Sequence, residues 1–113
     1  MTTHHFTDYP EVSPDIVGGV VRYVEHGIPP GDFLTAVLAN DLQEAVGRAD
    51  VHNLRALPNI VALVYNDLPG GAWGGRQSVK DWLGLNAVER DRILSHSRWP
   101  GVRGVPSVPA GQG

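Results

Sequence analysis

The 113-residue sequence contains no cysteine, which removes several classes of chemistry at once. Without cysteine there are no disulfide bonds, no thiol nucleophiles and no thiolate ligands for a metal ion. The sequence also lacks an apolar run near the roughly 18 residues that a membrane-spanning helix needs. Its first ten residues lack the basic start and apolar block of a secretory signal. We therefore expect a cytoplasmic protein that does not enter a membrane.

Lysine is nearly absent as well, since Lys80 is the single lysine among nine basic residues, and the formal net charge is −3. Proteins that bind duplex nucleic acid usually carry a basic face, because each neutralised phosphate releases counterions. The charge balance argues against such a partner. Arginine grips a discrete phosphate or carboxylate better than lysine does, so the composition favours a small anionic ligand.

Apolar residues recur at helical spacing, and no segment alternates apolar and polar residues over strand length. A first helix follows the N-cap candidate Ser13 and stops at Gly27. Its Gly18 and Gly19 should each cost about 1 kcal/mol relative to alanine, so we expect a close approach to that backbone. A second helix runs from Pro30 to about residue 47 or 48. Its predicted buried stripe is Leu34, Val37, Leu38, Leu42 and Ala45.

A third helix begins after the N-cap candidate Asp50 and is expected to kink at Pro58. Its predicted core-facing stripe is Leu54, Leu57, Val61, Val64 and Leu68. A short helix follows around Trp82, and a last one starts at Asn86, which has Glu89 at capping-box spacing. These patterns predict an all-α bundle of four to five helices over residues 13–98. An irregular arm over residues 1–12 and a Pro/Gly-rich tail over residues 99–113 flank it.

Asn40 and Asp41 interrupt the apolar stripe of the second predicted helix. On a continuous helix Asp41 points at or near the core, where a carboxylate needs hydrogen-bond partners. One interpretation makes it a structural plug bonded to a helix start, an indole N–H or Arg48. The other places Asn40, Asp41 and Arg48 in a ligand-binding site. We favour the plug for Asp41 and a ligand contact for Asn40.

The stretch PGGAWGGR, residues 69–76, forms a second candidate site. Gly74 and Gly75 precede a predicted helix, whose free N–H groups favour anions. Arg76 would add a phosphate grip, and Trp73 a face on which a base stacks. The alternative is that Trp73 anchors the core and the glycines only permit the turn. The glycine spacing matches neither a phosphate-binding loop nor a dinucleotide fingerprint.

Other chemistries find little support. No histidine pair has the spacing of a helical metal site, no serine lies in a nucleophile elbow, and no cofactor motif is present. We therefore predict a protein without catalytic activity, metal or cofactor. Trp99, beside Pro100, is expected to be exposed and to bind a partner. The glycines of the first helix suggest pairing with a second copy, which makes a homo-oligomer the expected state.

Residues 26–83 resemble small uncharacterised proteins of phages and prophages. The resemblance rests on HGIPPGDFLTAVLANDLQEAVGRADVHNLRAL, followed by VYNDLP, AWGG and VKDWL. It implies a protein made inside a bacterial cell, and no catalytic residue is carried over. We expect an accessory protein that counters host antiviral defence by sequestering a small anionic signalling nucleotide. The alternatives are an anti-CRISPR-like inhibitor that binds a host defence complex and a structural virion protein.

Overall fold

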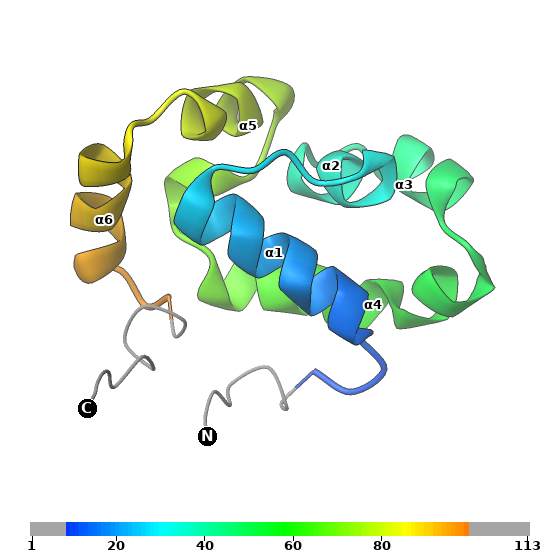
Figure 1. Ribbon diagram of the computed structural model, residues 1–113. Coiled ribbons are helices and arrows are strands. Elements are labelled where there is room, and N and C mark those ends of the chain that lie inside the picture. The colour runs from blue at the N-terminus through cyan, green and yellow to red at the C-terminus, as the bar shows by residue number, and fades with distance from the viewer. Residues whose placement is uncertain (1–8, 100–113) are drawn as a thin grey trace.

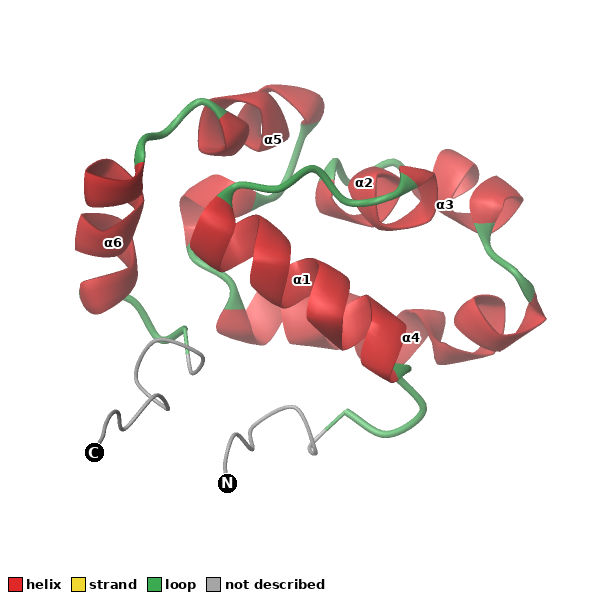
Figure 2. Cartoon of the chain, in the orientation of Figure 1, coloured by secondary structure: helices red, strands yellow, loops and turns green. Residues whose placement is uncertain are grey.

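A computed structural model describes residues 9–99, and in that range the chain is helical throughout, without strands (Figures 1 and 2). This confirms the all-α class. The arm and tail predicted from the sequence fall largely outside the described residues. The elements in chain order are α1 (Pro14–His26), α2 (Asp32–Leu38), α3 (Leu42–Arg48), α4 (Val51–Asp67), the 3-10 turn η2 (Gly70–Ala72), α5 (Arg76–Leu83) and α6 (Ala87–Ser95).

The first helix forms as its end signals predict. The Ser13 hydroxyl accepts a hydrogen bond from the Ile16 N–H at 3.2 Å, and Gly27 ends the helix in the left-handed conformation, with φ of 66°. Gly19 allows α2 to approach, because a Cβ there would lie 3.2 Å from the Leu34 side chain. The predicted close approach to this backbone therefore exists, at Gly19.

Helix α1 supplies the centre of the core. Tyr23 is fully buried, and its hydroxyl donates a hydrogen bond of 2.8 Å to the Ala72 carbonyl of η2. The indole N–H of Trp82 in α5 donates in turn to the Tyr23 carbonyl at 3.1 Å. These two bonds tie one helix to two later segments, since buried polar groups need partners.

The second predicted helix is wrong as a single element, because it divides into α2 and α3. Asn40 takes a left-handed conformation, with φ of 60°, and its N–H donates to the Val37 carbonyl. Asp41 then caps α3 through a hydrogen bond from the Glu44 N–H. The division turns Leu42 out of the core, to 67% exposure. It also brings the number of α-helices in residues 9–99 to six, above the four to five expected.

The face of α4 that enters the core matches the predicted one only in part, since Val64 and Leu68 are buried as expected. The buried residues in α4 are Ala56, Ile60, Leu63 and Val64, whereas Leu54 and Val61 are each 46% exposed. Helix α4 thus carries two apolar faces. Only one of them packs against the rest of the chain.

The C-terminal end of the described chain corrects another expectation. Helix α6 starts with the predicted capping box of Asn86 and Glu89. Trp99, predicted to be exposed, is fully buried, and its indole N–H donates a 2.9 Å hydrogen bond to the Glu25 carboxylate of α1. The predicted partner-binding role of Trp99 required an exposed ring, and the structure does not provide one. Among the described helices, none has both the length and the apolar character of a membrane span.

Candidate functional site

The turn between α2 and α3 is joined to the loop that precedes α5. The Asp41 carboxylate accepts hydrogen bonds from the Glu44 N–H at 3.2 Å and from the Arg76 guanidinium at 2.5 Å. The backbone hydrogen bond from Glu44 and the hydrogen bond and charge of Arg76 hold the pKa of Asp41 below its ordinary value. Two sequence-predicted sites, far apart in the chain, therefore meet through Asp41 and Arg76.

This geometry corrects the interpretation of Asp41 as a core plug. Its side chain remains 34% exposed, and its role is to cap α3 and pair with Arg76. Asn40, beside it, is exposed at the mouth of a pocket. Asn40 and Asp41 interrupt the apolar stripe because they occupy a break between two helices, a position at which Asn and Asp are favoured.

The predicted anion cradle at the start of α5 is already engaged by the protein. The Gly74 N–H donates to the Leu38 carbonyl at 2.8 Å, and the Arg76 guanidinium pairs with Asp41. Gly75 is the N-cap of α5. An anion bound here would compete with a carboxylate of the same chain.

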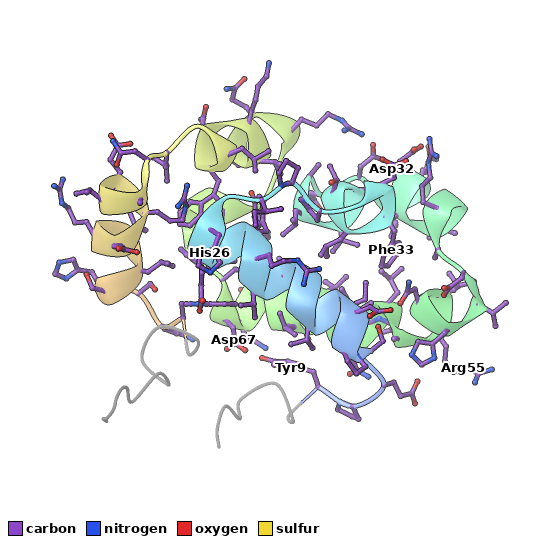
Figure 3. The ribbon with its side chains drawn as sticks, viewed as in Figure 1. Tyr9, His26, Asp32, Phe33, Arg55 and Asp67 are labelled. Atoms are coloured by element: carbon purple, nitrogen blue, oxygen red, sulfur yellow. The ribbon has the colours of Figure 1, made fainter. Side chains whose placement is uncertain are left out.

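Arg48 does not join these residues. Its guanidinium pairs with Glu44 at 2.7 Å and with Asp32 at 3.4 Å. Figure 3 shows Asp32 on the side of α2 that faces outward. Arg48 therefore braces the outer side of α2 and α3 instead of lining a ligand site.

A pocket of about 250 Å³ lies between the α2–α3 segment and α4. Apolar side chains dominate its walls, and Asn40 and Asp41 are its polar members. The lining residues are Ala36, Val37, Asn40, Asp41, Leu42, Ala45, Leu57, Val61, Val64, Tyr65 and Trp73. The pocket brings together three of the residues predicted for ligand binding, but its character favours an apolar group over a phosphate.

Trp73 separates this pocket from a second depression. The edge of its ring meets Tyr65, with ring centroids 5.7 Å apart, and both side chains line both spaces. Trp73 is half-buried, and its indole N–H is buried without an acceptor among residues 9–99. An indole N–H normally finds a partner when buried, so Trp73 combines a core anchor with an unsatisfied donor.

The second depression is a broad groove of about 970 Å³ between the end of α4, η2 and α6. Three basic side chains line it: Arg92 in the last turn of α6, His96 at the C-cap of that helix, and Arg98 two residues further on. All three are exposed, and within the described chain none forms an ion pair with a carboxylate. We name Arg92, His96, Arg98, Tyr65 and Trp73 the basic–aromatic groove.

Sequence reasoning missed the basic half of this groove. The signal was present, because Arg92 and His96 are four residues apart near the end of a predicted helix and Arg98 follows two residues later. It was weak because basic residues are common there, where the helix dipole favours cations. What the sequence does not reveal is that the end of α6 lies beside Trp73.

Within residues 9–99, no three or more histidine, aspartate or glutamate side chains come together as a group that could hold a metal ion. Comparison with known proteins returned no match: no family, no curated protein and no solved structure is similar to the chain. The resemblance to phage proteins therefore stays an expectation, and function is argued from the groove alone.

Proposed function

We propose that this chain is a binding protein without catalytic activity that sequesters a small anionic ligand of nucleotide type in the basic–aromatic groove. One observation carries the proposal. Arg92, His96 and Arg98, which have no carboxylate partner in the described chain, line one groove together with the aromatic side chains of Tyr65 and Trp73. Cations suit phosphate oxygens, and aromatic faces suit a base.

The groove supports an anion better than the start of α5 does. Arg92 and Arg98 have exposed guanidinium groups that can meet phosphate oxygens in bidentate fashion. Arg76 would first have to leave Asp41. The helix dipole explains why basic residues lie at the end of α6, but it does not explain why aromatic side chains line the same groove.

The rest of the groove suits close contact with a ligand. Gly70 and Gly71 are exposed on its floor, and no Cβ hinders the approach of a base or sugar to their backbone. Two guanidinium groups, one imidazole and two aromatic rings can contact a ligand there, but they supply no activated nucleophile. Sequestration is therefore the activity that we propose.

The biological setting of the proposal comes from the phage resemblance. A phage protein made in the cytoplasm of a bacterial host would gain from removing a nucleotide that signals infection. The groove, which offers charge for phosphate and aromatic surface for a base, fits such a molecule. The choice of probes tests the class of ligand, and the phage setting is a separate expectation.

The test is a titration of the full chain with ATP, cyclic dinucleotides, adenosine and inorganic pyrophosphate. Thermal shift and calorimetry measure the binding of each probe. A bound nucleotide at 100 times its dissociation constant should stabilise the fold by about 2.7 kcal/mol. We expect Arg92→Ala and Arg98→Ala each to weaken binding about tenfold or more. Arg55→Ala is the matched control, since Figure 3 shows Arg55 at the end of α4 away from α6.

The outcomes separate the parts of the proposal. Binding of nucleotides, with weaker binding of pyrophosphate and of adenosine, supports a site that uses both charge and rings. Equal losses in Arg55→Ala and Arg92→Ala would mean that net charge, not the groove, attracts the ligand. A flat titration with every probe would overturn the proposed function.

A further inference from the structure

A second surface of the molecule is apolar and largely exposed within the described chain, and it shares Tyr65 with the basic–aromatic groove. It is formed by one side of α3 and the unburied face of α4. We name it the α3–α4 face, and its residues are Leu42, Val46, Leu54, Leu57, Val61 and Tyr65. Leu42 is 67% exposed and Tyr65 70% exposed, large fractions for apolar side chains on neighbouring helices.

The spacing on α4 is that of a helix-pairing seam. Leu54, Leu57 and Val61 follow one another at intervals of three and four residues, and Tyr65 comes one turn later. Side chains at this spacing form the stripe by which two helices pack against each other. The core already occupies the other apolar face of α4, through Ile60 and its neighbours. The free stripe is therefore suited to receive a helix.

The charges around the face limit the kind of partner. Arg76 pairs with Asp41 at one border, and Arg48 pairs with Glu44 and Asp32 at another. Two arginines face three carboxylates, which leaves a formal charge of only −1 at these borders, and all five charged groups are paired within one chain. Such paired, exposed charges are screened by salt and repel a second copy only weakly, so the apolar area of the face decides its partner.

The exposed area is also close to what a dimer needs. A fully exposed leucine or valine side chain offers on the order of 100 Å² and an aromatic one about 200 Å². Given the exposures of 44–70%, the face presents on the order of 350 Å² before Leu57 is counted. A standard interface takes about 800 Å² from each partner, a little over half of it apolar.

We propose that two copies of this chain pair through the α3–α4 face, with their α4 helices antiparallel about a two-fold axis. In such an isologous contact the same patch meets itself. The exposed part of α4 runs from Leu54 to Tyr65, which places its middle between Pro58 and Val61. Val61 therefore lies near its own copy, while Leu54 of one chain faces the Tyr65 end of the other.

The pairing surface differs from the one suggested by the glycines of the first helix. Gly19 of α1 is approached by Leu34 of the same chain, and Gly18 lies beneath the Arg22 side chain. Those glycines therefore serve contacts within one chain. Six of the nine large apolar residues that are exposed in the described chain are on α3 and α4 instead.

The first test is sedimentation equilibrium of the full chain over a wide concentration range. We expect a monomer–dimer equilibrium, weakened at least a hundredfold by Val61→Arg, because a guanidinium would be buried at the axis. Val88→Arg is the matched control. Val88 is 67% exposed on α6 and belongs to neither the face nor the groove. Circular dichroism and thermal unfolding establish that each variant is folded.

The second test uses the absence of cysteine. A Val61→Cys variant carries a single thiol, so a short bismaleimide can join two copies only where these thiols lie close together. We expect rapid cross-linking of Val61→Cys and slow, concentration-limited cross-linking of Val88→Cys. This readout does not require any variant to break the dimer.

The results divide plainly. A dimer lost in Val61→Arg and captured through Val61→Cys supports the inference. A monomer at every concentration overturns it, as does a dimer that survives Val61→Arg and cross-links no better at position 61 than at 88. Tyr65 belongs to both surfaces, but the dimer tests change position 61 and the ligand test changes Arg92 and Arg98, so either proposal can fail while the other holds.

Discussion

Asp41 shows how one side chain can serve local and long-range structure together. Its first oxygen caps α3 through the Glu44 N–H, and its second receives the Arg76 guanidinium from the start of α5. The neighbouring Asn40 makes the helix break possible, because asparagine tolerates the left-handed conformation better than most residues. The polar pair therefore organises a junction of three helices.

The capping role predicts a graded response to substitution. Asp41→Ala removes both the cap and the ion pair, and we expect it to lower the melting temperature by about 5 °C at pH 7. Asp41→Asn keeps a capping side chain but loses the charge, so its effect should be smaller. Thermal unfolding followed by circular dichroism measures both. Equal losses in the two variants would assign the stabilisation to charge alone.

The same carboxylate predicts a pH dependence with a defined sign. Because the folded chain lowers the pKa of Asp41, its charge stabilises the fold above the unfolded-state pKa of about 4. That stabilisation is lost as the pH falls through the lower, folded-state pKa. The difference in melting temperature between wild type and Asp41→Asn should therefore shrink between pH 5 and pH 2. A difference that stays constant would show that the charge is not responsible.

At the residue scale, the sequence identified part of the site and misjudged the rest. Trp73, Asn40 and Asp41 do line one pocket. Arg76 was expected to grip a ligand, but it grips Asp41 because the helix break brings that carboxylate within reach. Arg98 was not selected, since its position beside Trp73 depends on how α6 returns to the end of α4. Such proximity is tertiary information that spacing along the chain does not contain.

At the scale of elements, local signals predicted helix ends well where they agreed with the apolar pattern. The Ser13 cap, the Gly27 stop and the Asn86 capping box are all present. The break between α2 and α3 also had a signal, because Asp41 precedes Glu44 at capping spacing. The continuous apolar stripe outweighed that signal in the prediction. The structure resolves the conflict by ending α2 and exposing Leu42.

The two adjacent glycines of α1 predict opposite responses to alanine. A Cβ at Gly18 would meet only the flexible guanidinium of Arg22, at 3.1 Å, whereas one at Gly19 would meet the buried Leu34 side chain at 3.2 Å. Gly18→Ala should stabilise the fold by about 0.5–1 kcal/mol through helix propensity. Gly19→Ala should destabilise it by about 1 kcal/mol, because overpacking in the core exceeds that gain.

Urea unfolding of the two variants measures both effects, and each serves as the control for the other. They change the same residue type by the same group, one position apart in one helix. If both alanines stabilised the chain equally, the approach of Leu34 to Gly19 would not restrict this helix. If both destabilised it, a partner outside the described chain would cover Gly18.

Helix α4 shows why the choice between two apolar faces is not local. The stripe through Leu54 and Val61 matches helical spacing as well as the one through Ile60 and Leu63. Small Ala56 and branched Ile60 enter the core because the packing partners in the rest of the chain meet that side. A stripe predicts that a face is buried against something. It does not say whether the partner belongs to the same chain.

At the scale of the whole molecule, the C-terminal end of the described chain closes the fold. Helix α6 contacts α1 and stands at one end of the bundle (Figure 1). Trp99, just beyond it, is buried and bonded to Glu25 of α1. This closure also sets the position of Arg92 and Arg98, which line the same groove as Trp73. The proposed ligand groove therefore depends on the anchoring of α6.

The anchoring predicts that Trp99→Ala is the more damaging of two tryptophan substitutions. Removing this fully buried ring should cost about 3–5 kcal/mol and leave the Glu25 carboxylate without the indole donor. The free energy of unfolding of a domain of this size is about 5–15 kcal/mol in total, so the variant should be marginally folded near room temperature. Trp73→Ala should cost less, because Trp73 is only half-buried and its N–H has no acceptor within residues 9–99.

Urea unfolding followed by circular dichroism compares the two variants, and ligand titration separates their roles. Trp99→Ala should cause the larger loss of stability. It should weaken ligand binding only through the fraction of molecules in which α6 is detached. A saturating ligand should therefore partly restore the melting temperature of this variant. The Trp73→Ala variant should retain most of the stability of the wild type. Its ligand binding should be weaker, because the stacking contribution of the indole ring is lost. The reverse order, with Trp73→Ala the less stable protein and Trp99→Ala nearly unchanged, would place the closing anchor of the molecule at Trp73. The aromatic wall of the groove would then be core, and the nucleotide proposal would rest on the three basic side chains alone.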